Sequence, residues 1–342
     1  MNKIEEKLSE IYSSRYFISF GYCRNGLISL LSSLKLKSDA EIIIPAFTCS
    51  AIPSSIKKAG YKPVPVDSEK NSLNISPEEV KKHITEKTAG IYVVHTYGIP
   101  ADIERIDSIA KEKDLFLIED IAHSLLSEYK GRLLGEWADF TIVSLTKQMI
   151  NSGGGAIGIK DKKIYEEVLE KRNDYYSKEL FSFIKTIVYK ILRFVSSVWE
   201  SRTNLVCLFT AKFIDSIVIF FFGSEKADDD VRPSFYKICP AESWFACLEL
   251  ERLRHRRKFN EAGYQLFIKK FNNIMLPNAK GISNISYWGG MLSSSNKSKY
   301  QYILLKIFSF RTWKNYYEPG KYPQADKLFN SFRIFSRIVR YF

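Results

Sequence analysis

The chain has 342 residues, of which 45% are hydrophobic and 26% are charged, a composition typical of a folded globular protein rather than a disordered one. The formal net charge of +13 fits an anionic partner or lysines spread over solvated faces, but the basic residues form no compact patch interleaved with aromatics, which argues against nucleic-acid binding. Five scattered cysteines without a CxxC pair, and four dispersed histidines, argue against a disulfide framework and against a metal centre.

From about residue 18 to residue 160, short apolar runs alternate with stretches of helical periodicity. The apolar runs predict strands at 41–45, 63–66, 91–95, 115–118, 140–143 and 156–159. The stretches between them predict helices at 26–34, 50–59, 77–83 and 103–113, the third with Ser76 as its N-cap and Pro77 at its first position. Strands that alternate with helices predict βαβ units and a mostly parallel sheet.

The second half of the chain differs in character. Residues 161–179 predict an exposed charged helix, and residues 243–271 predict another long helix. Between them, residues 180–223 carry apolar residues at helical spacing together with charges such as Lys185 and Arg193, which argue against a membrane span. The pattern of this insertion predicts one of two roles. The insertion either packs on its own subunit or forms a dimer interface, or it forms a pair of amphipathic helices that contact anionic lipid together with the basic tail at 332–342. We therefore expect a domain at 1–179, an insertion at 180–230 and a C-terminal domain at 231–342.

The N-terminus is charged and lacks the apolar stretch of a signal peptide. No run approaches the roughly 18 apolar residues that a spanning helix needs. We therefore expect a cytoplasmic protein, which the lipid-contact alternative for 180–223 would place at the inner face of the membrane.

The stretch from Phe116 to Gly155 places an acid and a lysine after two predicted strands. Asp120 follows the apolar run at 115–118, and Lys147 follows the run at 140–143, with Ser144 three residues before it. Ligands bind beyond the carboxyl ends of parallel strands. A lysine to form a Schiff base, an acid to keep a pyridine nitrogen protonated and a Gly-rich turn at 152–155 are what a pyridoxal phosphate site needs. The alternatives are a solvated lysine and an N-cap role for Asp120.

Further polar and aromatic residues follow predicted strands or open a predicted helix near the same edge. They are His123, Asn25, Gly26, Phe47, Cys49, His95 and Tyr97. The amides that open a helix suit a phosphate, which is a reason to include Asn25 and Gly26. His123 lies one turn after Asp120 and suits either a ligand contact or a core position. We expect His95 and Tyr97 to contact the substrate.

These motifs come in the order of a known family. The segments CRNGLISLL, IIIPAFTCSAI, KPVPVD, VVHTYGIPADI and IEDIAHS precede a Thr-Lys lysine and a GGG turn. The chain thereby resembles the DegT/StrS sugar aminotransferases over about residues 20–175, and more weakly over 230–330. The resemblance implies the α/β fold of type I pyridoxal phosphate transferases, with a large domain built on a mostly parallel seven-stranded sheet and a smaller C-terminal α/β domain.

The resemblance also implies an activity: transfer of an amino group from glutamate to a keto-sugar nucleotide, in the biosynthesis of a surface polysaccharide such as O-antigen or capsule. It implies pyridoxal 5'-phosphate as cofactor and a homodimer. By position, Lys147 would be the Schiff-base lysine, Asp120 the partner of the pyridine nitrogen and His123 a neighbour of the ring. Ser144 would hold the phosphate together with the amides of Asn25 and Gly26.

The chain departs from the family at several positions. Leu27 stands where the family has a phosphate-binding threonine, and Cys49 where it has an aromatic that stacks on the ring, a role that Phe47 or Tyr97 could take. The family's NYR segment corresponds at best to residues 235–237. Two alternatives stay open: a pyridoxal phosphate enzyme with a different amino acceptor, and a catalytically degenerate scaffold or membrane-recruited subunit. Lysine at 147 argues against the family's dehydratase branch, which has histidine there.

Overall fold

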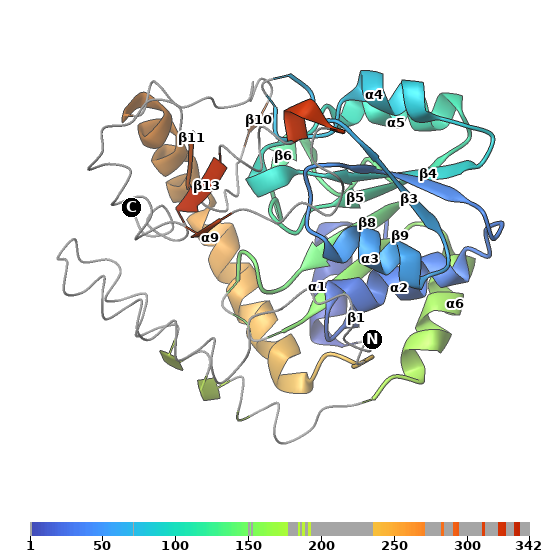
Figure 1. The fold of residues 1–342 in the computed structure, drawn as a ribbon. Helices are drawn as coiled ribbons and strands as arrows, with labels where there is room; N and C mark the ends of the chain where they lie inside the picture. Colours follow the sequence, from blue (N-terminus) through green and yellow to red (C-terminus); the bar gives the residue numbers. More distant parts are fainter. Residues whose placement is uncertain are drawn as a thin grey trace.

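A seven-stranded sheet forms the centre of the computed structural model (Figure 1). The structure describes residues 2–176 except 71, 150 and 152, then 184, 187–188, 191–192, 235–270, 282–283, 290–293, 310–311, 321–325 and 332–335. The strands of the central sheet are β1 (Tyr16–Phe20), β2 (Glu41–Pro45), β3 (Lys62–Val66), β4 (Thr88–Val94), β5 (Phe116–Asp120), β8 (Phe140–Ser144) and β9 (Gly155–Ile159).

The strand order across this sheet is β1-β9-β8-β5-β4-β2-β3. Strands β3, β2, β4, β5 and β8 pair in parallel. Strand β9 runs antiparallel to both of its neighbours, β8 and β1. The prediction of a mostly parallel seven-stranded sheet is therefore confirmed. All six strands predicted from the apolar runs are present, with bounds shifted by at most three residues. Strand β1 was not predicted, although its sequence YFISF has the same apolar character as the others.

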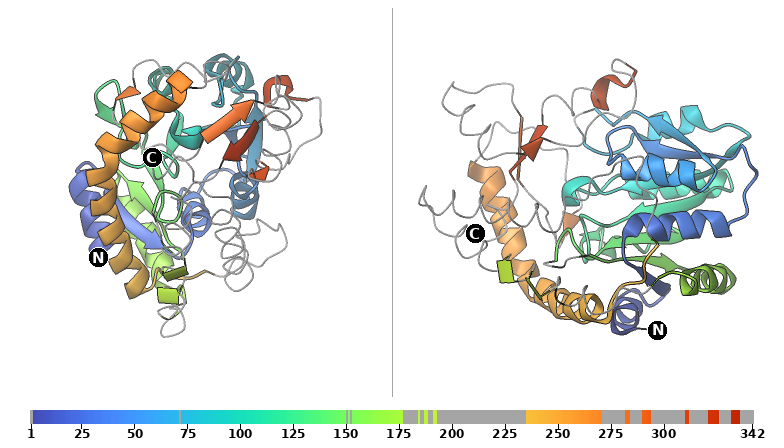
Figure 2. Two further views of the ribbon diagram at one scale, coloured as in Figure 1. Left: turned by 90° about the vertical axis from the view of Figure 1, so that its left-hand side faces the viewer. Right: turned by 60° about the horizontal axis from the view of Figure 1, so that its bottom comes forward.

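Helices cover both faces of the sheet (Figures 1 and 2). They are α1 (Lys3–Ile11), α2 (Cys23–Ser33), α3 (Ala51–Lys58), α4 (Pro77–His83), α5 (Ile103–Glu112), α6 (Lys162–Asn173) and α9 (Pro240–Lys270). Apolar residues of α2, α3 and α6 pack on one face, and those of α1, α4, α5 and α9 pack on the other. The N-cap prediction for α4 is confirmed, because the Ser76 side chain accepts a hydrogen bond from the Glu79 amide at 3.3 Å.

Two small sheets lie outside the central one. The first contains β10 (Ile282–Ser283), β6 (Glu128–Tyr129) and β7 (Arg132–Leu133), and the second contains β11 (Gly290–Ser293), β13 (Phe332–Phe335) and β12 (Phe310–Arg311). Most of the predicted insertion at 180–230 lies outside the described residues, so its two alternatives and the domain boundaries stay predictions. Among the described helices, none has the length and hydrophobicity needed to cross a bilayer.

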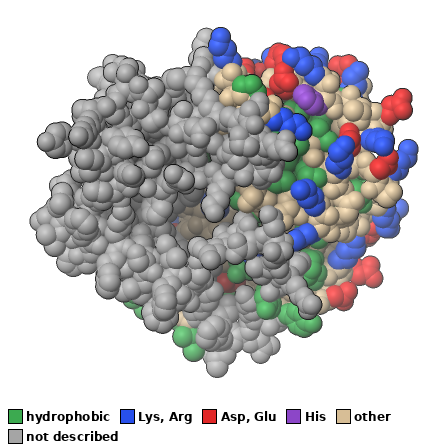
Figure 3. Space-filling model, in the orientation of Figure 1, with side chains coloured by type: hydrophobic (Ala, Val, Ile, Leu, Met, Phe, Trp, Pro, Cys, Tyr) green, Lys and Arg blue, Asp and Glu red, His purple; other side chains and the backbone are tan. Residues whose placement is uncertain are grey.

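Charged side chains of both signs are interspersed over the described part of the face that Figure 3 shows. Lys and Arg alternate there with Asp and Glu rather than gathering in one field. Ion pairs near the surface of the described residues include Arg105 with Glu78 and Lys82 with Glu79. On this face, the distribution fits a positive net charge spread over solvated surface.

Candidate functional site

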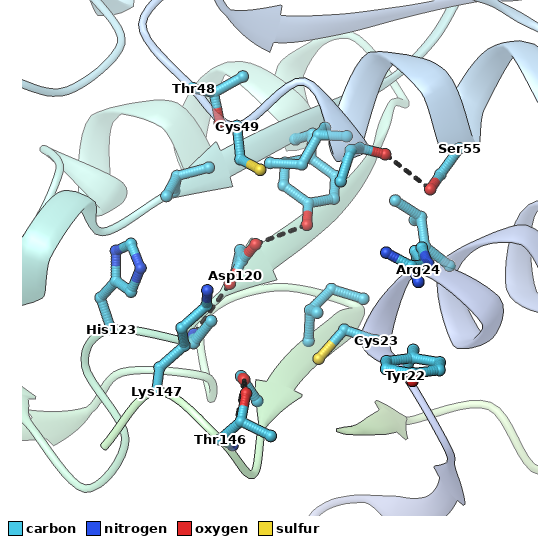
Figure 4. A pocket seen from close by; sticks show the side chains of 18 of the residues that line it. Tyr22, Cys23, Arg24, Thr48, Cys49, Ser55, Asp120, His123, Thr146 and Lys147 are labelled. Atoms are coloured by element: carbon cyan, nitrogen blue, oxygen red, sulfur yellow. Dashed lines mark hydrogen bonds between the residues drawn. The ribbon is translucent and has the colours of Figure 1, made fainter. Parts of the chain in front are cut away.

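A pocket lies at the carboxyl ends of β4, β5 and β8, on the sheet face that α2 and α3 cover (Figure 4). Four predicted site residues line it where these strands end or just beyond, namely Asp120, His123, Ser144 and Lys147, and Leu27 and Cys49 line it from the helical side. The remaining lining residues are Tyr22, Cys23, Arg24, Thr48, Ala51, Ile52, Ser55, Tyr92, Val94, Ala122, Ile142, Thr146 and Gly154. The predicted lysine, acid, histidine and hydroxyl therefore meet at one place.

Asp120 is the last residue of β5, and both oxygens of its buried carboxylate are held by donors. The Tyr92 hydroxyl donates to Oδ2 at 2.7 Å, and the Ala122 amide donates to Oδ1 at 2.8 Å. Burial raises the pKa of Asp120 above its usual value, although both hydrogen bonds and the nearby Lys147 charge act in the opposite direction. A buried carboxylate of this kind requires a donor or cationic partner.

Lys147 lies in the loop that follows β8, partly buried and with its side chain beside Asp120 and His123 (Figure 4). The next residue, Gln148, accepts a hydrogen bond from the Leu125 amide at 2.7 Å, which ties this loop to the segment after Asp120. The Gly-rich turn closes the loop, since the Leu145 amide donates to the Gly154 carbonyl at 3.1 Å. Gly154 has a φ of 104°, which favours glycine at that position.

His123 is buried at the pocket wall and is neutral near pH 7. Burial, together with the Lys147 charge, lowers the pKa of His123 to about 3. The Tyr97 amide donates to Nδ1 at 3.2 Å, so the neutral ring carries its proton on Nε2. The Tyr97 ring stacks behind the imidazole with centroids 5.3 Å apart and planes 9° apart. His123 is therefore fixed as a flat, uncharged surface beside Lys147.

The N-terminus of α2 forms another side of the pocket. The N-cap residue Tyr22 supplies no side-chain hydrogen bond to the helix, and its carbonyl accepts from the Asn25 amide at 3.1 Å. The Arg24 guanidinium lies over the Tyr22 ring at 4.6 Å, so a positive charge stands at the positive end of the helix dipole. Both the charge and the dipole favour an anion at this position. The α2 N-terminus therefore suits a phosphate group.

Hydroxyl groups complete the polar lining. The Ser144 and Thr146 hydroxyls are 3.2 Å apart at the start of the lysine loop. The Thr48 side chain is fully buried, and its Oγ1 has no hydrogen-bond partner among the residues that the structure describes. An orphaned buried hydroxyl in a pocket wall indicates a polar ligand.

Asn25, Gly26 and Phe47 are not among the residues that line this pocket, and their ligand roles stay predictions. Helix α2 begins at Cys23, three residues earlier than predicted, and the pocket therefore meets Cys23 and Arg24. Gly26 serves packing, because a Cβ there would lie 2.6 Å from Ile157 and 2.9 Å from Phe20. Asn25 and Phe47 are both fully buried outside the lining.

His95 and Tyr97 are likewise absent from the lining of this pocket, and their contacts with a substrate stay predictions. His95 is fully buried, accepts a hydrogen bond from the Ala101 amide on Nδ1 at 3.1 Å, and therefore donates from Nε2 to Glu119 at 2.9 Å. Glu119 precedes Asp120, and successive strand residues point to opposite faces of a sheet. The pair of His95 and Glu119 thus lies on the face opposite the pocket. Tyr97 lies behind His123 and is fully buried.

The predicted site residues left out several polar residues of the lining, among them Tyr22, Arg24, Thr48, Tyr92 and Thr146. Two of them belong to the helix N-terminus, whose start was placed too late. Tyr92 pairs in register with Ile118, and Val94 pairs with Asp120, so Tyr92 shares the sheet face of Asp120. Counting strand alternation back from Asp120 would have identified Tyr92 and excluded His95.

The fold and pocket define an α/β protein that presents a lysine, a buried carboxylate and a helix N-terminus to one ligand. The model of the DegT/DnrJ/EryC1/StrS aminotransferase family matches residues 1–183, and the chain belongs to this family. The resemblance described from the motifs is therefore confirmed.

Individual relatives are similar over about half of the chain. GDP-perosamine synthase of Escherichia coli O157:H7 is 33% identical over 174 residues, which are 49% of this chain and 47% of the relative. A dTDP-3-amino-3,6-dideoxy-alpha-D-galactopyranose transaminase of Aneurinibacillus thermoaerophilus is 30% identical over 176 residues, 51% of this chain and 48% of the relative. The chain thus spans about half the length of the curated relatives it matches.

Among solved structures, the aminotransferase from Psychrobacter cryohalolentis superimposes with a TM-score of 0.72 at 19% identity, over 98% of this chain and 86% of that one. At this level of identity, the likeness shows the fold alone. The predicted fold class, a type I pyridoxal phosphate transferase fold, is confirmed.

Proposed function

We propose that the protein is a pyridoxal phosphate-dependent aminotransferase that moves an amino group from glutamate to a keto-sugar nucleotide. The observation that supports this most strongly is the convergence of Lys147, Asp120 and the α2 N-terminus around one pocket. The family and the relatives named above support the reaction class and the sugar nucleotide. A place in surface polysaccharide biosynthesis, a homodimer and a cytoplasmic location belong to the same proposal.

The residues of the pocket fit pyridoxal phosphate in chemistry and placement. Lys147 supplies the amine to which the cofactor's aldehyde carbon would attach, and Asp120 supplies the charge for the ring nitrogen. The α2 N-terminus with Arg24, together with the Ser144 and Thr146 hydroxyls, supplies donors for a phosphate. When bound, the cofactor supplies an electron sink for the carbon that exchanges its amino group.

Each polar residue has a distinct task in this proposal. Asp120 would accept a hydrogen bond from a protonated ring nitrogen, and its two donors help to keep it negatively charged. Lys147 would move a proton at the carbon that exchanges its amino group, as a general acid and base. His123, neutral and stacked on Tyr97, covers one side of the site without adding charge.

A first experiment tests the cofactor. The purified protein is saturated with pyridoxal phosphate, reduced with borohydride and mapped by peptide mass spectrometry, and we expect the label on Lys147. Lys147→Ala should lose the label, whereas Lys160→Gln, a change at an exposed lysine outside the pocket, should keep it. A cofactor-saturated protein with an unmodified Lys147 would contradict the proposal.

A second experiment tests the activity. The loaded protein is incubated with glutamate and a panel of keto-sugar nucleotides, and formation of 2-oxoglutarate and amino sugar is followed. Glutamate alone should convert the bound chromophore to its amine form. Conversion with glutamate but no acceptor turnover across the panel would favour a different amino acceptor. A protein that binds the cofactor and never converts it would favour a degenerate scaffold.

A further inference from the structure

We propose that Tyr92 is a positioning residue: its hydroxyl fixes the Asp120 carboxylate so that this acid holds a protonated ring nitrogen. This inference rests on the proposed function and names a residue that acts on the cofactor through Asp120. It concerns a side chain that lines the pocket and that was not among the predicted site residues.

Strand pairing places Tyr92 where it can reach the acid. Strands β4 and β5 pair in parallel with Tyr92 opposite Ile118 and Val94 opposite Asp120. Paired residues point to the same face, so Tyr92 and Asp120 share the pocket face and lie two positions apart along the strand direction. A tyrosine side chain is long enough to cover that offset, and its hydroxyl reaches Oδ2 of Asp120 at 2.7 Å.

The hydrogen bond settles the orientation of the carboxylate. The Ala122 amide holds Oδ1 at 2.8 Å, so the Tyr92 hydroxyl completes a two-point attachment that fixes the plane of the group. A carboxylate oxygen can accept a second hydrogen bond, so each oxygen keeps capacity for a donor from the pocket. Asp120 is therefore oriented before any ligand binds, which reduces the ordering cost of binding.

The same bond also favours the charged form of the acid. A donor to a carboxylate stabilises the anion, and here it opposes the effect of burial. Burial and the Asp120 charge raise the pKa of Tyr92 well above its usual value, so this phenol stays protonated and can donate near neutral pH. Core packing alone does not account for the hydroxyl, because phenylalanine would fill nearly the same volume without a polar atom to satisfy.

The test compares two ligands in two proteins. Tyr92→Phe should weaken binding of pyridoxal phosphate about tenfold, since a hydrogen bond to a charged group contributes at about that level. An analogue with carbon in place of the ring nitrogen has no proton to share with Asp120, and its affinity should change less than about twofold. The absorption spectrum of bound pyridoxal phosphate should also shift toward that of the unprotonated ring.

Tyr12→Phe is the matched control. Tyr12 is also fully buried, and its hydroxyl accepts a hydrogen bond from the Leu126 amide at 3.3 Å on the other face of the sheet. This variant should bind both ligands as the wild type does. If Tyr92→Phe does not fold, Tyr92→Leu, which also lacks the hydroxyl, must show the same preference.

The outcomes separate this inference from the function on which it rests. Equal losses for both ligands, or no loss for either, would overturn the role of Tyr92 while leaving the cofactor in place. A wild-type protein that fails to bind pyridoxal phosphate at all would overturn the proposed function first. A loss confined to pyridoxal phosphate, with the spectral shift, would support both.

Discussion

Removing His123 should make the protein less sensitive to mild acid. The pKa of His123 is lowered from 6.5 to about 3 in the folded state by burial and by the Lys147 charge. Below pH 6.5 the unfolded chain binds a proton at this residue and the folded chain does not. Its contribution to stability is therefore fully present above that pH and is lost as the pH falls toward 3.

The size of the effect follows from linkage. At about pH 5, a histidine that is fully available to protons when unfolded and unavailable when folded lowers the free energy of unfolding by about 2 kcal/mol. At about pH 7.5 the same term is close to zero. The value at about pH 5 barely changes if the folded pKa is one unit higher, because the folded residue is still almost entirely neutral.

The assay is urea unfolding of the cofactor-free protein at these two pH values, for wild type and His123→Gln. A glutamine can still accept the Tyr97 amide proton and does not titrate. The variant should lose about 2 kcal/mol less than the wild type between the two conditions. His83→Gln, at a half-exposed histidine near the end of α4, should behave as the wild type. Equal losses in wild type and His123→Gln, within about 0.5 kcal/mol, would refute a neutral buried His123.

Two further predictions concern α2. Arg24→Gln should weaken binding of pyridoxal phosphate about threefold to tenfold at low salt and leave binding of pyridoxal unchanged. Titration followed by the absorbance of the bound ligand measures both affinities. An equal loss of affinity for both ligands would exclude a contact between Arg24 and the phosphate. Gly26→Ala should lower the free energy of unfolding by about 1–3 kcal/mol, because the added methyl group would clash with Ile157 and Phe20. Ser32→Ala, on the exposed side of the same helix, should change the free energy of unfolding by less than about 0.5 kcal/mol. Denaturant unfolding measures the second pair, and similar values for both variants would show that α2 can move away from the sheet.

The central sheet could be predicted from the sequence because most of its strands, such as β2, β8 and β9, are buried on both faces. Runs such as EIIIP in β2 are continuous in apolar residues and bounded by turns, which gives a strong local pattern. Helix α4 was predicted with the observed bounds because Ser76 and Pro77 fix its first turn. The start of α2 could not be read in this way, since Tyr22 is not a residue that caps helices with its side chain.

At the site, the sequence identified the strands whose carboxyl ends carry polar residues, but not the face of the sheet to which each side chain points. Lys147, Asp120 and His123 were placed correctly in one pocket because each follows a strand that ends at the same edge. His95 also follows a strand, but it has the alternation of Val93 and Glu119, so it points to the other face. The local apolar pattern predicts where strands lie, whereas the register between paired strands decides which residues a given side chain contacts.

Two adjacent acids end β5 and point to opposite faces of the sheet. Glu119 accepts a hydrogen bond from His95 in the interior, and Asp120 lines the pocket. Deleting one residue earlier in β5 would exchange the sheet faces of the two acids. Glu119 would then point to the pocket, and Asp120 would point to the space that Glu119 fills. Insertion or deletion of one residue in β5 should therefore abolish ligand binding even if the protein still folds. Loops far from β5 should tolerate such changes.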